Sequence, residues 1–244
     1  VAGFGVECIE YHLGGTFRGS YYTLNDNIIN GRIRGIGGVV GCNNARTKHN
    51  EGHVQIVKEL IKNDVIVLTT GCNAIACAME GLLTPETAAV FCGPGLAEVC
   101  ETVGIPPVLH LGSCVDNSRI LLAATEVVNA GGLGQDISEL PAAGSAPEWM
   151  SEKAISIGHY FVASGVYTEF GVTLPVTGAP VFQKYLFEEF EKMYGGMWDL
   201  EIDPIKHAQK MIAHIDKKRK ALGIDRARER ILVDMAARRD IEVA

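Results

Sequence analysis

The chain has 244 residues, of which 47% are hydrophobic and 21% are charged. This is enough to bury a substantial core, and we expect a single α/β domain over residues 1–244. The net charge of −7 argues against a nucleic-acid-binding face, and no apolar run reaches the roughly 18 residues that span a membrane. The cysteine count is odd, at seven, and the cysteine spacings do not resemble a disulfide scaffold, which predicts a reduced, cytoplasmic protein. Because the chain starts at Val1 without a methionine or signal peptide, we expect it to belong to a longer parent.

The pattern of the chain changes near residue 33. Residues 1–32 are rich in glycine and aromatic residues and contain a short amphipathic stretch at 24–30, and they predict an entry helix and a surface loop. From there on, apolar β-branched runs alternate with helical periodicity, which is typical of a mostly parallel sheet covered on both faces. The first three strands are expected at 35–40, 65–69 and 108–111.

The helices are predicted from apolar residues at helical spacing. Four are expected in the first half of the domain, at 54–62, 84–91, 96–103 and 115–128. Residues 131–147 contain many glycine, proline and alanine residues, and we expect a long loop there. Further helices are predicted at 148–163, 181–193 and 204–222, with short strands at 172–174 and 198–202. The expected fold is therefore a Rossmann-like three-layer α/β domain.

Three cysteines stand where an apolar run ends. GIGGVVGC ends at Cys42, DVIVLTTGC at Cys72 and VLHLGSC at Cys114. Because the carboxyl ends of parallel strands face one crevice, neighbouring strands would bring the three thiols into a shared space. Small or polar residues follow each cysteine and indicate the start of a helix, whose dipole would lower the thiol pKa and favour the thiolate. The pattern predicts a metal or metal-cluster site, although any one of these cysteines could instead be a packing residue.

Other polar residues receive simpler interpretations. Cys8, Cys77 and Cys100 fit packing positions, whereas the role of Cys92 is left open. We expect His110 to lie in its strand with its ring bonded to a backbone carbonyl. His49 and His53 could bind a metal, but a solvated start of a helix fits them better. The basic run 217–220 is expected to be a solvated last helical turn.

Four motifs carry a family resemblance when they are taken together and in order. GVVGCNN, VLTTGCNAIA, VLHLGSCVDNSR and PEWMSEKA resemble the C-terminal domain of the catalytic subunit of anaerobic nickel-iron carbon monoxide dehydrogenases. The octet GSCVDNSR is the most specific of them. The resemblance implies an oxidoreductase that interconverts CO and water with CO₂, two electrons and two protons.

The resemblance also implies roles for five residues. Cys42 and Cys72 would hold irons of a nickel, four-iron, four-sulfur cluster, and Cys114 would ligate the nickel. Soft thiolates are the ligands that such clusters select. Lys153 would hydrogen-bond the bound carboxylate and supply positive charge where negative charge develops. Ile157 would shape the gas pocket.

The remaining parts of such an enzyme are expected upstream of this chain. They comprise a histidine and two cysteine ligands and the further 4Fe-4S clusters that pass electrons on, so we expect this chain alone to be inactive. The implied substrates are CO, CO₂ and water. The implied partners are a redox protein such as ferredoxin, the rest of the catalytic subunit and, for the parent, a second copy in a homodimer.

Three alternatives are weighed against this interpretation. Hybrid-cluster-type iron-sulfur oxidoreductases resemble these enzymes in fold and use a TTGC-like turn, but their cluster lacks nickel and the VDNSR sequence favours the dehydrogenase. A nucleotide-binding Rossmann module is disfavoured because GIGGVV lacks the last glycine of G-x-G-x-x-G. The third alternative is a metal-free structural α/β domain with inert thiols.

Overall fold

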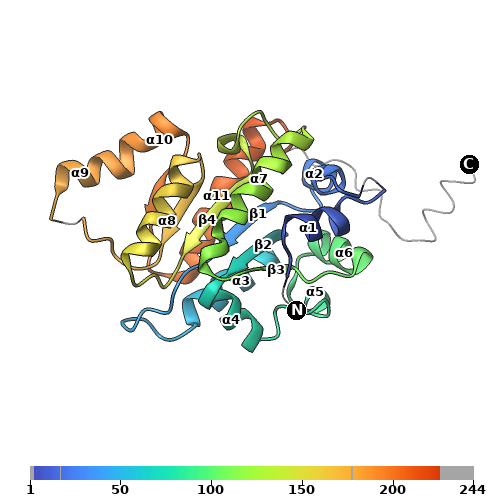
Figure 1. Cartoon of the computed structure of the whole chain (residues 1–244), viewed down its shortest axis with the longest axis horizontal. Coiled ribbons are helices and arrows are strands. Elements are labelled where there is room, and N and C mark those ends of the chain that lie inside the picture. The colour runs from blue at the N-terminus through green and yellow to red at the C-terminus, as the bar shows by residue number, and fades with distance from the viewer. Residues whose placement is uncertain (1–2, 17, 177, 226–244) are drawn as a thin grey trace, which may run out of the picture.

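A single all-parallel sheet organises the computed structural model, which describes residues 3–16, 18–176 and 178–225 (Figure 1). Its six strands lie in the order β3-β2-β1-β4-β5-β6. The strands are β1 (Gly35–Val39), β2 (Val65–Thr70), β3 (Val108–Gly112), β4 (Ala142–Ala146), β5 (Tyr167–Phe170) and β6 (Trp198–Leu200). This is the order of doubly wound dinucleotide-binding folds, and it reverses direction between β1 and β4. The predicted parallel α/β fold is confirmed.

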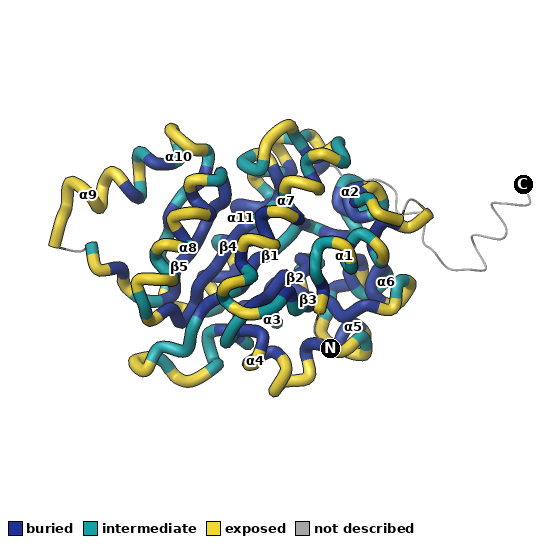
Figure 2. The backbone as a smooth tube through the Cα atoms, in the orientation of Figure 1, coloured by how far each residue is buried: buried dark blue, intermediate teal, exposed yellow. Residues whose placement is uncertain are grey.

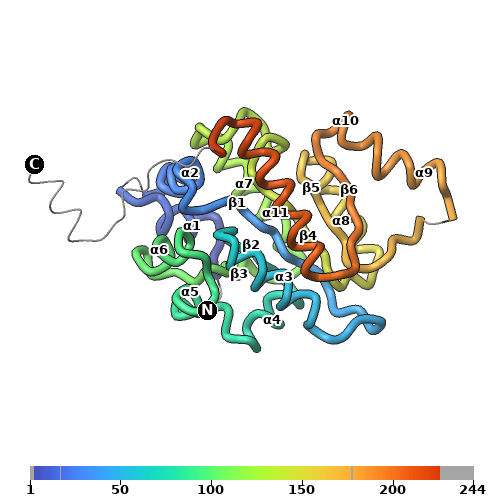
Figure 3. The backbone as a smooth tube through the Cα atoms, turned by 180° about the vertical axis from the view of Figure 1, so that it is seen from behind, coloured from blue at the N-terminus to red at the C-terminus, as the bar shows by residue number. Residues whose placement is uncertain are grey.

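Helices cover both faces of the sheet. One face carries α3 (Glu51–Lys62) and α11 (Pro204–Ala221), which lie in front in Figure 3. The other face carries α1 (Val6–Leu13), α2 (Tyr22–Ile29), α7 (Ser118–Ala130) and α8 (Glu152–Ala163) (Figure 1). No helix within the described ranges is both long and apolar enough to cross a membrane.

Shorter helical segments follow the strands. After β2 come α4 (Gly71–Met79), α5 (Thr87–Phe91) and α6 (Pro94–Val103). The 3-10 helices η1 (Cys114–Asn117) and η2 (Ile137–Glu139) flank α7. An arm beyond α8 consists of α9 (Pro180–Lys184), the π-helical turn η3 (Tyr185–Glu189) and α10 (Phe190–Tyr194), and much of its surface is exposed (Figure 2).

The sheet is buried on both faces, as Figure 2 shows by its dark strands. Every residue of β2 (VIVLTT) is buried, which explains why the sequence runs apolar there instead of alternating. The strand β1 lies so close to its neighbours that a Cβ on Gly35 would stand 2.4 Å from the carbonyl oxygen of Pro141 and 2.5 Å from the Ile215 side chain. Glycine at this position therefore lets α11 pack directly on the sheet.

The prediction of a long loop at 131–147 is wrong, because these residues include the strand β4. The strand sequence AAGSA has little intrinsic strand propensity. It is held instead by pairing on both sides, to β1 and to β5. The next strand, β5, lies at 167–170 and not at the predicted 172–174, and α8 begins at Glu152 and not at 148. The other predicted strands and the long helices are found within a few residues of the expected positions.

Two further expectations fail because of long-range hydrogen bonds. The N-terminal region forms two helices, α1 and α2, in place of one helix and a loop. The second is tied to the end of α7 by Asn25, whose Nδ2 donates to the carbonyls of Val127 and Gly131, both at 2.8 Å. Arg219, predicted to be solvated, is 7% exposed and donates to backbone carbonyls such as those of Ile28 and Arg34.

Candidate metal-cluster site

The three strand-end cysteines follow three consecutive strands of the sheet. Cys42 lies in the loop after β1, Cys72 in the first turn of α4 after β2, and Cys114 at the start of η1 after β3. Since β3, β2 and β1 are neighbours in a parallel sheet, all three residues lie at the same edge. The sequence alone did not show whether these strands are neighbours, and the structure shows that they are.

The turns that carry these cysteines touch one another. The amide of Cys72 donates a hydrogen bond of 3.1 Å to the carbonyl of Gly41. Gly71 adopts φ +61°, and a Cβ there would stand 2.5 Å from the Sγ of Cys114 and 3.4 Å from the Gly41 carbonyl oxygen. A side chain at this position would both strain the backbone and displace the thiol, so the motif TTGC requires its glycine.

A cavity of about 40 Å³ brings four of the five predicted site residues together. Cys42 and Cys114 line it, and so do Lys153 and Ile157 from α8. The cavity lies where the strand order reverses, beside the ends of β1 and β4, which is where open α/β sheets bind ligands. Cys72 does not line the cavity. It lies at the same edge of the sheet, where its amide bonds to the carbonyl of Gly41.

The donor set fits a cluster better than a single ion. All seven cysteines are free thiols. Within the residues that the structure describes, no three histidine, cysteine, aspartate or glutamate side chains are grouped closely enough to hold one ion. Thiolates around an iron-sulfur cluster stand farther apart than ligands of one ion, because several metal and sulfide ions lie between them. Three soft thiols at one sheet edge match that requirement.

The pKa of the Cys72 thiol is raised, and the predicted lowering by a helix dipole is wrong for this residue. Burial raises its pKa most, followed by the nearby Cys114 and Cys42 thiols. A hydrogen bond from the backbone of Asn43 acts in the opposite direction, and the charge of Glu148 raises the pKa further. The Cys72 thiol thus lies within electrostatic reach of the Cys114 and Cys42 thiols. A bound cation reverses this balance, since coordination deprotonates a thiol.

The turn that carries Cys114 is fixed by a capping box. The Asp116 carboxylate accepts from the amide of Ser113 at 2.8 Å and from its hydroxyl at 3.2 Å. These bonds lower the pKa of Asp116 and keep it ionised. Buried Asn117 accepts a hydrogen bond from the hydroxyl of Thr70, which ties η1 to the end of β2. The polar residues of GSCVDNSR thus hold the Cys114 backbone in place.

The Cys42 loop differs from the expectation in two ways. Residues 43–50 do not form a helix, since α3 begins only at Glu51. His53, predicted to be solvated, is 0% exposed, and its Nε2 lies 2.6 Å from the carbonyl oxygen of Cys42. His49 is exposed as expected. No local sequence pattern indicates the His53 contact, which joins α3 to the cysteine loop.

Lys153 is exposed on the first turn of α8 while it lines the cavity. Among the described residues, no carboxylate forms an ion pair with it. Ile157, one turn later, is half-buried and also lines the cavity. This places a positive charge and an apolar side chain on the same wall.

The other cysteines lie in the core, and His110 differs from its prediction. Cys77 and Cys100 are fully buried, and Cys8 and Cys92 pack against the same core. Burial raises the pKa of Cys77 and of Cys92 to about 12, as expected for thiols that stay protonated. The Nδ1 of His110 is buried and has no hydrogen-bond partner within the described part of the chain, so the predicted carbonyl contact is not found at that nitrogen.

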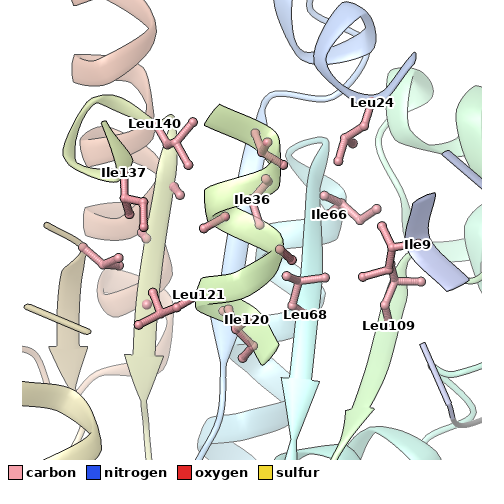
Figure 4. A pocket seen from close by; sticks show the side chains of 18 of the residues that line it. Ile9, Leu24, Ile36, Ile66, Leu68, Leu109, Ile120, Leu121, Ile137 and Leu140 are labelled. Atoms are coloured by element: carbon pink, nitrogen blue, oxygen red, sulfur yellow. The ribbon is translucent and has the colours of Figure 1, made fainter. Parts of the chain in front are cut away.

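A second cavity, of about 50 Å³, lies next to the first. It lies between the sheet and α7 and is lined by aliphatic side chains such as Ile36, Leu68 and Leu121 (Figure 4). Gly38 and Phe161 line both cavities, so the two are adjacent. An apolar cavity of this kind excludes water and accepts small apolar molecules.

Comparison with known proteins identifies the family. A model of the Prismane/CO dehydrogenase family matches residues 6–205. This chain belongs to the Prismane/CO dehydrogenase family. The predicted resemblance is confirmed at this level.

Relatives in the Prismane/CO dehydrogenase family are similar to nearly the whole chain. Carbon monoxide dehydrogenase 1 of Methanosarcina acetivorans is 56% identical over 92% of this chain and 35% of its own length. Carbon monoxide dehydrogenase 1 of Carboxydothermus hydrogenoformans is 42% identical over 82% of this chain and 32% of its own length. The chain therefore spans about a third of these relatives.

Solved structures of carbon monoxide dehydrogenases share the fold. The as-isolated, nickel-free enzyme from Thermococcus sp. AM4, produced without the CooC maturase, superposes with a TM-score of 0.85 at 54% identity, over 91% of this chain and 34% of that chain. An acetyl-CoA synthase/carbon monoxide dehydrogenase with NiZn[Fe4S4] and NiNi[Fe4S4] clusters in its alpha subunits gives a TM-score of 0.87 at 34% identity, with 91% and 34% coverage.

Proposed function

We propose that this chain is the part of a nickel-iron carbon monoxide dehydrogenase that supplies three thiolate ligands and one positive charge to the cluster that reacts with CO. The observation that carries the proposal is the shared cavity at the sheet edge, where Cys42, Cys114, Lys153 and Ile157 meet. Membership of the Prismane/CO dehydrogenase family supports the proposed reaction, and the residues that line the cavity support the proposed roles.

The cysteines would divide between two kinds of metal. We propose Cys42 and Cys72 as ligands of iron in the cubane part of a Ni-4Fe-4S cluster and Cys114 as the ligand of nickel. When bound, this group would supply the two-electron redox chemistry that interconverts CO and CO₂. The protein's contribution is to hold soft thiolates at fixed positions, which the contacts of Gly71 and Asn117 achieve from the neighbouring turns.

Lys153 would act on the developing carboxylate. Its side chain lines the cavity, and no carboxylate among the described residues forms an ion pair with it. A fixed positive charge stabilises negative charge on oxygen more strongly where water is excluded. Ile157 and Phe161 line the same cavity and reduce the access of water. Together they make a small site that suits a substrate with few atoms.

The size of the cavity argues against a nucleotide-binding module. A volume of about 40 Å³ is far below the roughly 300–1,000 Å³ of pockets for drug-sized ligands. The glycine pattern of the β1 turn also lacks the last glycine of the dinucleotide fingerprint. A small gaseous substrate fits this site better.

The rest of the reaction is assigned to the whole protein. Since the relatives are about three times as long, we propose that the histidine, the other two cysteine ligands and the electron-transferring 4Fe-4S clusters come from outside this chain. A ferredoxin-like redox partner, a homodimer and a cytoplasmic location are likewise predictions for the whole protein.

The test is CO oxidation by the natural protein at its full length, purified without oxygen. We expect CO-dependent reduction of a viologen dye, together with nickel, iron and sulfide in the purified protein. The matched control is the Cys114→Ala variant, which should lose the activity. Absence of both CO oxidation and nickel in fully matured wild-type protein would refute the proposal.

A further inference from the structure

A buried polar pair lies behind the Cys42 loop and has no role in the reaction as proposed. Glu148, in the segment between β4 and α8, is 1% exposed, and His53, on α3, is 0% exposed. The Nε2 of His53 lies 2.6 Å from the carbonyl oxygen of Cys42 and 4.0 Å from Oε2 of Glu148. His53 therefore contacts the backbone of one predicted cluster ligand, and Glu148 lies beside His53.

The carboxylate of Glu148 is occupied by donors from the same loop and from α3. Its Oε2 accepts from Nδ2 of Asn43 at 3.1 Å, and its Oε1 accepts from the amide of Gly52 at 3.1 Å. No lysine or arginine among the described residues pairs with it. Burying a carboxylate in this way is costly and is a weak source of stability. Because both carboxylate oxygens accept hydrogen bonds, the buried Glu148 instead fixes the relative positions of Asn43 and Gly52.

The same segment is bonded to the Cys42 loop a second time. Nδ2 of Asn44 donates to the carbonyl of Trp149 at 2.6 Å, and the Trp149 indole donates to the carbonyl of Val172 at 2.7 Å. Two consecutive side chains of the loop thus bond two consecutive residues of the segment. That segment leads directly into the first turn of α8, which carries Lys153.

We propose that Glu148 is a positioning residue that, with His53, sets the place of Cys42 relative to Lys153. The inference rests on the proposed function, because that proposal assigns Cys42 as a cluster ligand and Lys153 as the positive charge. Groups that hold metal ligands from behind commonly tune metal retention without touching the metal. Glu148 touches neither the substrate nor the thiol, and its effect passes through Asn43 and the backbone of Cys42.

The informative variant is Glu148→Gln, which keeps the size of the side chain. The substitution replaces one carboxylate oxygen by an NH₂ group, which is a hydrogen-bond donor. Either Nδ2 of Asn43 or the amide of Gly52 then faces this donor and loses its hydrogen bond to residue 148. Adding Asn43→Asp to this variant exchanges amide and carboxylate between the two positions and restores a hydrogen bond. Glu101→Gln, on an exposed residue of α6, is the matched control for the loss of one charge.

Two measurements on the natural full-length protein separate this inference from the proposed function. The first uses protein stripped of metal and follows alkylation of each cysteine by iodoacetamide with peptide mapping. We expect Glu148→Gln to raise the alkylation rate of Cys42 more than that of Cys72, whose rate also rises because the Glu148 charge no longer raises its pKa. The rate of Cys114 should change least, the double variant should restore the wild-type rates, and Glu101→Gln should leave them unchanged. An unchanged rate at Cys42, or an equal rise at all three cysteines, overturns the inference.

The second measurement follows iron loss to a chelator from anaerobically purified protein. We expect Glu148→Gln to lose iron about 10- to 100-fold faster than the wild type, as for other groups that support metal ligands from behind. The double variant should recover most of this difference. Iron retention equal to the wild type, despite a more reactive Cys42, overturns the positioning role. If the wild type holds no cluster, the proposed function fails, and the alkylation result alone decides whether Glu148 positions Cys42.

Discussion

The amide N–H of Cys72 donates a hydrogen bond of 3.1 Å to the carbonyl oxygen of Gly41, which joins the turns after two neighbouring strands. The bond is made by backbone atoms alone, and its register follows from the pairing of β1 with β2. The relative position of the Cys42 and Cys72 turns is thus set by the sheet. Backbone pairing thus accounts for the proximity of these two turns.

We therefore expect the chain to fold without metal. Its core contains a sheet buried on both faces, and most of its stability should come from hydrophobic burial. In metal-free buffer with a chelator, circular dichroism should show one cooperative thermal transition. A transition that vanishes when metal is removed would contradict this and would make the cluster a folding ligand.

Gly71→Ala should displace the Cys114 thiol. The new Cβ would stand 2.5 Å from Sγ of Cys114, in addition to the strain of an L-residue at φ +61°. Nickel and iron content of the full-length protein should both fall, because the turns of two cluster ligands shift. Metal content is measured by inductively coupled plasma mass spectrometry after anaerobic purification.

The control for this prediction is Gly81→Ala. Gly81 has a similar φ of +73°, but a Cβ there meets no atom within 4 Å. Both variants should lose stability by the roughly 1–2 kcal/mol that the left-handed region costs an L-residue. Equal metal loss in the two variants would mean that backbone strain, and not the contact with Cys114, is responsible.

Cys114→Ala and Lys153→Ala should separate metal binding from charge stabilisation. In the full-length protein, Cys114→Ala should abolish CO oxidation and lose nickel, while iron falls much less because Cys42 and Cys72 remain. Lys153→Ala should keep both metals and slow turnover about 100-fold or more, the effect of removing one preorganised stabilising donor. Equal nickel loss in both variants, or an active Cys114→Ala, would refute the assignment of these roles.

Glu169→Gln should change the pH dependence of stability. Glu169 on β5 is fully buried, and burial and then the charge of Asp199 raise its pKa to about 8, although Lys210 lies 3.7 Å away. The folded state therefore keeps this proton between about pH 4.5 and 8 while the unfolded state loses it, so the wild type loses stability as pH rises through that range.

The measurement is the difference in free energy of unfolding between the wild type and Glu169→Gln, from urea titrations at several pH values. The wild type should become less stable relative to the variant by up to about 1.4 kcal/mol for each pH unit. Taking the difference removes the opposite contribution of His214, whose pKa burial lowers to about 4. The contribution of His207, whose pKa burial also lowers to about 4, does not cancel fully, because its Nε2 lies 3.9 Å from Oε2 of Glu169. A difference that does not change with pH would contradict the raised pKa of Glu169.

The sequence predicted the elements whose signals are local. The strands that precede Cys42, Cys72 and Cys114 are continuous apolar runs, and α6 ends at Gly104 in the left-handed region as its sequence indicates. The small-residue strand β4 was missed because its pairing with β1 and β5, and not its own composition, makes it a strand. The role of neighbouring strands in gathering three cysteines was predictable once the sheet was assumed to be parallel.

The supporting residues of the site were not predictable in the same way. His53 looks like a helix-start residue, and Glu148 looks like the first residue of an amphipathic helix. Their contacts with Cys42 and Asn43 join segments that are far apart in the chain, and no local pattern encodes them. Only Asn117, inside GSCVDNSR, could have been found as a polar residue that follows a ligand directly.

Anomalous diffraction at the iron and nickel absorption edges, on anaerobic crystals of the full-length protein, tests the central claim most directly. It locates each metal relative to Cys42, Cys72 and Cys114 without relying on activity. We predict iron peaks bonded to Cys42 and Cys72 and a nickel peak bonded to Cys114, all at the carboxyl edge of the sheet beside Lys153. Iron and nickel bound elsewhere, with these three thiols free in matured protein, would contradict the assignment.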